Sequence, residues 1–176
     1  ELPPGTGMKL TSQTQILLQL HLLNATNAPI TDSTGVTMQL ASDPSAPFTP
    51  AGVYGLDNRK IDVPPNSAGY QVSMPCTPGK TMNVFALFGH MHRIGTHINV
   101  TRNGGEVLFD SGWNFDVQPT TTKQLTINPT DQLTLTCTYA NTSSAHVTYG
   151  ESTLNEMCAF IFYYTTFDGL DGCIQQ

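Results

Sequence analysis

Two histidines separated by one residue, His90 and His92, have a spacing that could bind a metal ion. Side chains alternate between the two faces of a β-strand, so both imidazoles point to the same side. Taken alone, such a pair is more often two polar residues on a solvated surface. Here it follows the run 84–88, which is apolar on both faces and typical of an interior strand. Two unpaired imidazoles would be costly there, and this favours metal ligation.

Met157, at the start of another apolar run, is a candidate third ligand. A thioether added to two imidazoles selects for Cu(I) over zinc or iron. A methionine that opens an apolar strand is more often part of the core, so this assignment depends on the wider pattern of the sequence.

The remaining candidate motifs are weaker. We expect His21 to be a core histidine or one that supports a ligand, His97 to be peripheral and His146 to be solvated. The Asp-Gly pattern at 168–172 lacks the ligand run and closing Glu of a calcium loop, so we expect a C-terminal turn. The sequence contains no Gly-x-Ser-x-Gly motif and no carboxylate pair suited to glycoside hydrolysis.

The elements that must position these side chains are predicted to be β-strands. Short stretches rich in β-branched and aromatic residues recur between Pro, Gly, Asn or Asp, whereas helix signals are almost absent. The candidate strands are 15–23, 35–41, 70–74, 81–92, 96–101, 106–109, 124–127, 132–139 and 157–165, with loops at 44–50 and 63–68. About nine strands predict an antiparallel β-sandwich.

Length and charge exclude several classes of protein. A chain of 176 residues suits one domain over residues 1–176. The net charge is −6 and the seven Lys and Arg are scattered, so we expect no nucleic-acid partner. No apolar run approaches the about 20 residues that span a bilayer, so we expect no membrane span. The start, Glu-Leu-Pro-Pro-Gly, is not a signal peptide, and we interpret it as a processed start or as part of a longer chain.

The chain has four cysteines, which allow three pairings: Cys76, Cys137, Cys158 and Cys173. None lies in a Cys-x-x-Cys arrangement, which argues against a zinc knuckle or a redox dithiol. An even number in a chain with only 11% charged residues favours two disulfides and an oxidising compartment. We therefore expect a secreted protein, extracellular or periplasmic.

Taken together, these features resemble the C-terminal catalytic domain of the copper type II, ascorbate-dependent monooxygenases, the family of peptidylglycine α-hydroxylating monooxygenase and dopamine β-hydroxylase. The combination of His-x-His with a downstream Glu-Met-Cys at this separation is specific. The likeness covers nearly all of the chain and is carried by residues 2–8, 17–21, 89–92, 113–115, 131–141 and 150–158.

The resemblance implies a jelly-roll-like sandwich that holds one copper ion, cycling between Cu(I) and Cu(II), on His90, His92 and Met157. These ligands would also be the catalytic residues, because the copper activates O₂ to hydroxylate an aliphatic C–H bond. Ascorbate or another reductant would donate electrons. The resemblance also implies two disulfides, Cys137–Cys158 and Cys76–Cys173.

The sequence departs from the family in two respects. The N-terminal domain, with a second copper on three histidines, is not found, so turnover would need that domain as a partner or an external electron donor. The arginine that holds the substrate carboxylate in peptide-amidating members is Phe88 here, and an asparagine and a tyrosine after the methionine are Ala159 and Ile161. Of the possible small-molecule or peptide substrates, the resemblance then favours an apolar or uncharged one.

Three functions follow, in order of preference. The first is a copper-dependent monooxygenase domain. The second is a copper-binding module without catalysis, for storage or delivery, and ascorbate-driven oxygen consumption would separate the two. The third is a structural β-sandwich that keeps a vestigial site.

Overall fold

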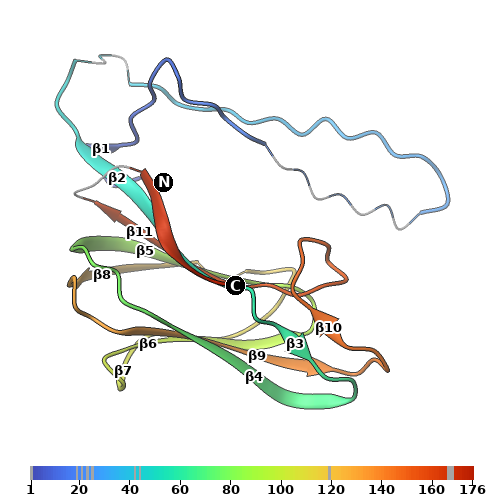
Figure 1. Cartoon of the computed structure of the whole chain (residues 1–176). Helices are drawn as coiled ribbons and strands as arrows, with labels where there is room; N and C mark the ends of the chain where they lie inside the picture. Colours follow the sequence, from blue (N-terminus) through green and yellow to red (C-terminus); the bar gives the residue numbers. More distant parts are fainter. Residues whose placement is uncertain are drawn as a thin grey trace.

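The computed structural model describes residues 2–18, 20, 22, 24, 26–41, 43, 45–118, 120–165 and 169–176. Over these residues the chain forms a β-sandwich of two main sheets and no helix (Figure 1). None of this part of the chain forms a helix able to cross a membrane. The predicted all-β sandwich is therefore confirmed, with twelve strands in the described ranges rather than about nine.

The first sheet contains the strand that carries His90. Its order is β1 (Thr6–Gly7), β2 (Thr49–Asn58), β11 (Cys158–Thr165), β5 (Met82–Met91) and β8 (Thr120–Ile127), and β12 (Gly169–Gln175) also pairs with β2. The pairs of β2 with β1 and with β12 are parallel, and the others are antiparallel. Strand β5 is thus an interior strand, as its apolar run predicts.

The second sheet packs below the first in Figure 1 and is antiparallel throughout. Its order is β4 (Ser67–Cys76), β9 (Leu133–Asn141), β6 (Gly95–Arg102) and β7 (Glu106–Gly112). A separate two-stranded pair is formed by β3 (Asp62–Val63) and β10 (Val147–Thr148). Strict alternation of buried and half-buried residues along β9 and β11 places one face of each strand in the core between the sheets.

Both disulfides link one sheet to the other. Cys137 in β9 is bonded to Cys158 in β11, and Cys76 in β4 is bonded to Cys173 in β12. These are the two pairings that the resemblance implies, and they are confirmed. The first lies one residue from Met157, so it ties that part of the chain to the second sheet.

Seven of the nine predicted strands are confirmed, and two are wrong. The described residues of 15–23 and 35–41 form no strand, and their apolar side chains are exposed, with Leu17 at 91%. Alternating apolar residues predict a strand only where a ladder partner and a covering face exist, and neither is found for the described part of these segments. This part of the chain passes over the outer side of the first sheet (Figure 1). His21 lies outside the described residues.

Three strands of the first sheet were not predicted: the two-residue β1 and the longer β2 and β12. The expected loop at 44–50 runs into β2, whose Pro50, Gly52 and Gly55 resemble loop residues in the sequence. The turn expected at 168–172 is instead β12 from Gly169 onward, and Asp168 is outside the described residues. Added to Gly172, a Cβ would collide with the backbone oxygen of Gly55. Gly172 therefore marks a close approach of two backbones rather than a turn.

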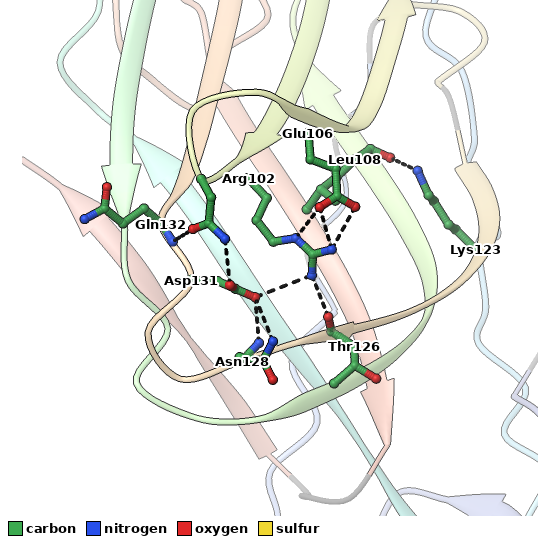
Figure 2. A network of polar contacts seen from close by, with 9 residues as sticks. Arg102, Glu106, Leu108, Lys123, Thr126, Asn128, Asp131 and Gln132 are labelled. Carbon is green, nitrogen blue, oxygen red and sulfur yellow. Dashed lines mark hydrogen bonds and ion pairs between the residues drawn. The ribbon is translucent and has the colours of Figure 1, made fainter.

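A polar network closes the end of the sandwich where the β6–β7 and β8–β9 turns meet (Figure 2). Asp131 accepts hydrogen bonds from the backbone N–H of Asn128 at 2.8 Å and from Asn103 Nδ2 at 2.9 Å. Arg102 lies 3.4 Å from Asp131 and also binds Glu106 through two nitrogens. The backbone N–H of Asn128, then the Asn103 amide, hold the pKa of Asp131 below its usual range.

We expect Asp131→Asn to lower the free energy of unfolding by about 1–2 kcal/mol near neutral pH, because a charged acceptor of several hydrogen bonds is lost. A carboxyl whose pKa is lowered by folding stabilises the fold above its unfolded pKa, and this contribution is lost as the pH falls. Chemical denaturation at several pH values should show the difference between the two chains shrinking below about pH 4. A difference that stays constant with pH would contradict this role for the carboxylate.

Candidate metal centre

The two histidines lie at the end of β5, next to the start of β11. The antiparallel register pairs Ala159 with His90 and Cys158 with Met91. Residues directly opposite each other share a face of the sheet. Met91 and Cys158 are buried in the core, so the alternate positions, His90 and Ala159, are on the outer face. Continued by one residue, the same register places Met157 opposite His92.

The two imidazole rings lie side by side, with centroids 5.3 Å apart and planes at 86°. His90 Nδ1 is 2.9 Å from Gln118 Oε1, and His92 Nδ1 is 3.1 Å from the backbone oxygen of Asn155. Both partners are oxygen acceptors, so in each neutral ring Nδ1 carries the proton and Nε2 carries the lone pair. This is the tautomer that a metal-binding histidine needs, with its orientation fixed by the other nitrogen.

His92 is held at its backbone as well as at its ring. Its backbone N–H donates to Glu156 Oε2 at 2.8 Å, and its carbonyl accepts from Trp113 Nε1 at 2.9 Å. The residue is 1% exposed, whereas His90 is half-buried. The ring of Phe115 packs edge-on against His92 at 6.3 Å between centroids. These contacts make His92 a rigid position for a ligand atom.

The backbone of Met157 is held from both sides. Its N–H lies 3.2 Å from Glu156 Oε2, and its carbonyl accepts from the hydroxyl of Tyr139 at 3.0 Å. Tyr139 is buried, and burial raises the pKa of its phenol, so this hydroxyl stays a donor. The Met157 side chain is half-buried.

Glu156 is a buried carboxyl at the centre of this arrangement, 1% exposed. Burial raises its pKa to about 7, against the opposing effect of backbone N–H groups that donate to it, first His92, then Ile94 and Met157. The carboxyl is thus linked to the backbone on both sides of the site.

A cavity of about 690 Å³ opens beside the two imidazole rings. Apolar side chains from the N-terminal segment, Leu20 and Leu22, line it together with Phe115. Arg93 and Glu151 are its charged lining residues. A small organic molecule could therefore reach the histidine pair from this side.

The donor set fits a soft metal ion. No group of three or more His, Cys, Asp or Glu side chains that could hold a metal occurs within the described ranges. Two imidazole rings are brought together, and the backbone N–H groups of His92 and Met157 share one oxygen of Glu156. Two nitrogens and a thioether suit Cu(I) better than zinc, calcium or magnesium.

Two further histidines of the described part of the chain, His97 and His146, lie outside this group. His97 lies on β6 in the second sheet, with its Nε2 3.1 Å from Asp110. His146 is 58% exposed in its side chain and pairs with Asp62 at 2.6 Å. Sequence reasoning missed the supporting residues Gln118 and Asn155, which belong to loops and carry no periodic signal.

Comparisons with known proteins agree with these observations. A family model described as "Copper type II ascorbate-dependent monooxygenase, C-terminal domain" matches residues 49–176. The human "Putative DBH-like monooxygenase protein 2" is 24% identical over 196 residues, covering 99% of this chain and 39% of the relative. The chain therefore spans about two fifths of that relative's length.

Two solved structures share weaker likeness. A GH26-CBM35 β-(1,4)-mannanase from Podospora anserina has a TM-score of 0.35 at 11% identity and covers 67% of this chain and 28% of its own. The structure of infectious bursal disease virus Gt strain has a TM-score of 0.17 at 12% identity, covering 76% and 42%. Both TM-scores are too low to establish a common fold.

Proposed function

The chain belongs to the family of copper type II ascorbate-dependent monooxygenase C-terminal domains, and on that premise we propose that it binds one copper ion through His90, His92 and Met157. The observation that carries this proposal is the state of the two imidazoles. Each has its Nδ1 at hydrogen-bonding distance from an oxygen, the arrangement that orients a metal-binding histidine, and we propose Nε2 of each as the ligand atom.

We propose that the domain acts in the hydroxylation of an aliphatic C–H bond. Copper, when bound, would supply the one-electron chemistry that activates O₂. The reaction adds one oxygen atom to the substrate and reduces the other to water, which takes two electrons and two protons. One copper ion would hold only one of these electrons at a time and must be reduced again after each turnover, so ascorbate, another reductant or a partner domain must supply both electrons.

The chain's own residues have clear tasks in this proposal. Gln118 and Asn155 keep the protons on Nδ1 and fix the planes of the two rings. Glu156 accepts a hydrogen bond from the backbone N–H of His92, and Trp113 donates one to its backbone carbonyl, so both polar groups of the His92 backbone are bonded. The site is therefore organised before a metal arrives, which reduces the cost of binding.

The outer face beside His90 favours an apolar or uncharged substrate. Phe88 is directly opposite Ile161 in the register, and both are half-buried on the face that carries His90 and Ala159. The ring of Phe88 stacks at 6.4 Å from that of His90. Phe88, Ala159 and Ile161 offer no cationic partner to a substrate carboxylate, and the cationic side chain that lines the cavity beside His90 is that of Arg93.

We propose a secreted, extracellular or periplasmic location. Two disulfides join the sheets, and such bonds persist in oxidising compartments.

Copper titration of the Met157→Ile variant tests the proposed ligand set. The wild-type chain should bind one Cu(I) per molecule, and the variant should lose Cu(I) affinity more than Cu(II) affinity, because the thioether favours the softer ion. Met38→Ile, at an exposed methionine, is the matched control and should bind as the wild type does.

Unchanged Cu(I) affinity in Met157→Ile would refute the thioether ligand. Tight copper binding without ascorbate-driven oxygen consumption, in the presence of candidate substrates and an electron donor, would instead identify a copper-binding module without catalysis.

A further inference from the structure

The two chain segments that carry His92 and Met157 are not joined by a β-ladder. The last pair of the β5–β11 ladder is Met91 with Cys158, so both proposed ligands lie one residue beyond it. A strand end without ladder hydrogen bonds is free to fray unless another group replaces them. Both ligands nevertheless need fixed positions to form one site.

The Glu156 carboxylate takes the place of the missing ladder. Its Oε2 accepts the N–H of His92 at 2.8 Å and lies 3.2 Å from the N–H of Met157, so one oxygen bridges the two backbones. Its Oε1 accepts the N–H of Ile94 at 2.8 Å, which holds the chain as it leaves the histidine strand. All the partners are donors, and both carboxylate oxygens are used.

The backbone of Glu156 is itself anchored. Its N–H donates to the carbonyl of Thr148 at 3.0 Å, and its carbonyl accepts from the N–H of Gly150 at 3.1 Å. An isolated bridge pairs it with Tyr149 between these two residues. The backbone of Glu156 is thus fixed to residues 148–150, and its carboxylate in turn bonds the backbones of both proposed ligands.

We propose that Glu156 is a positioning residue that sets the placement of the Met157 sulfur relative to the His92 ring. The inference rests on the proposed function, since it concerns the same site. It goes further because it assigns the geometry of the site to a residue that touches neither the metal nor the substrate.

The Glu156→Gln variant tests the hydrogen bonds of the carboxylate without changing the size of the side chain. Glutamine has nearly the same shape, but its amide offers one acceptor oxygen and one NH₂ group. The oxygen can serve either the His92 and Met157 pair or Ile94, and the NH₂ then faces an N–H donor. The Glu156→Asp variant keeps both acceptor oxygens, but its side chain is shorter by one methylene, so the oxygens lie further from the N–H groups of His92, Ile94 and Met157.

The test compares the copper-loaded and copper-free chains. In Glu156→Gln we expect Cu(I) affinity to fall by about 10- to 100-fold, the usual effect of losing a group that orients a ligand. X-ray absorption of the Cu(I)-loaded variant should lose the sulfur contribution and keep the nitrogen ligands. In the copper-free variant, hydrogen exchange at the amides of His92 and Met157 should become faster.

Asp131→Asn is the matched control. Asp131 is also a buried carboxylate that accepts a backbone N–H, but it lies at the β8–β9 turn. We expect this variant to lose thermal stability while its Cu(I) affinity and sulfur signal stay as in the wild type. Equal losses of affinity in both variants would show that general destabilisation, not positioning, is responsible.

The outcomes distinguish this inference from the proposed ligand set. A sulfur signal that disappears in Met157→Ile but remains in Glu156→Gln would overturn the inference alone. A wild-type Cu(I) complex without sulfur would overturn the proposed ligand set. If Glu156→Gln does not fold, Glu156→Asp carries the test, with the same loss of sulfur expected and an unchanged signal contradicting the inference.

Discussion

Substitution of His92 by alanine is expected to lower the affinity of the chain for Cu(I) by more than about 100-fold. Losing a group that only orients a metal ligand already costs 10- to 100-fold in affinity, and the loss of a ligand atom should exceed that. His92 is also the more rigid of the two proposed imidazole ligands, since its N–H, carbonyl and Nδ1 are all held. Competition with a chromophoric Cu(I) chelator measures the change.

His97→Ala is the control for this prediction. His97 is also on a strand and partly exposed, but it lies in the second sheet and pairs with Asp110. Its removal should leave Cu(I) affinity unchanged. If His92→Ala remains folded by circular dichroism and binds Cu(I) like the wild type, the proposed copper centre is wrong, whatever the family of the chain.

Local alternation predicted most of the sandwich. In β9 and β11 every second side chain is buried; the sequence of β9 shows the same alternation of apolar and polar residues, whereas β11 is a nearly continuous apolar run. The strand predicted at residues 15–23 from a short apolar run between turn residues was wrong: the described apolar side chains are exposed, because such a run carries no information about the neighbouring strand that it would need. Sequence patterns also failed at β2 and β12, where Gly172 lies close against the backbone of Gly55.

The histidine pair could be predicted for the same reason, since one pleat separates His90 from His92. The groups that orient the pair could not. Gln118 is 28 residues from its histidine, and Asn155 is 63 residues from His92. Both residues lie in loops, and the contacts form only when β8 and β11 pair with the two edges of β5 and bring these parts of the chain together. Glu156 was visible in the sequence only as part of a family motif, and its bond to the backbone of His92 is a result of the fold.

The two disulfides offer a way to separate stability from metal binding. Cys76–Cys173 encloses a sequence separation of 97 residues and Cys137–Cys158 one of 21. On a chain-entropy estimate these contribute about 4.7 and about 3 kcal/mol to the free energy of unfolding. The longer one is bonded through β12, which is separated from β5 by β2 and β11. The shorter one is bonded at Cys158, next to Met157.

We therefore expect opposite orders of effect in the two double alanine variants. Removal of Cys76–Cys173 should cause the larger loss of stability in chemical denaturation, with Cu(I) affinity close to that of the wild type. Removal of Cys137–Cys158 should cause the smaller loss of stability but a marked fall in Cu(I) affinity, because the start of β11 is no longer tied to β9. Equal effects of both variants on Cu(I) binding would mean that the bond beside Met157 does not help to position its sulfur.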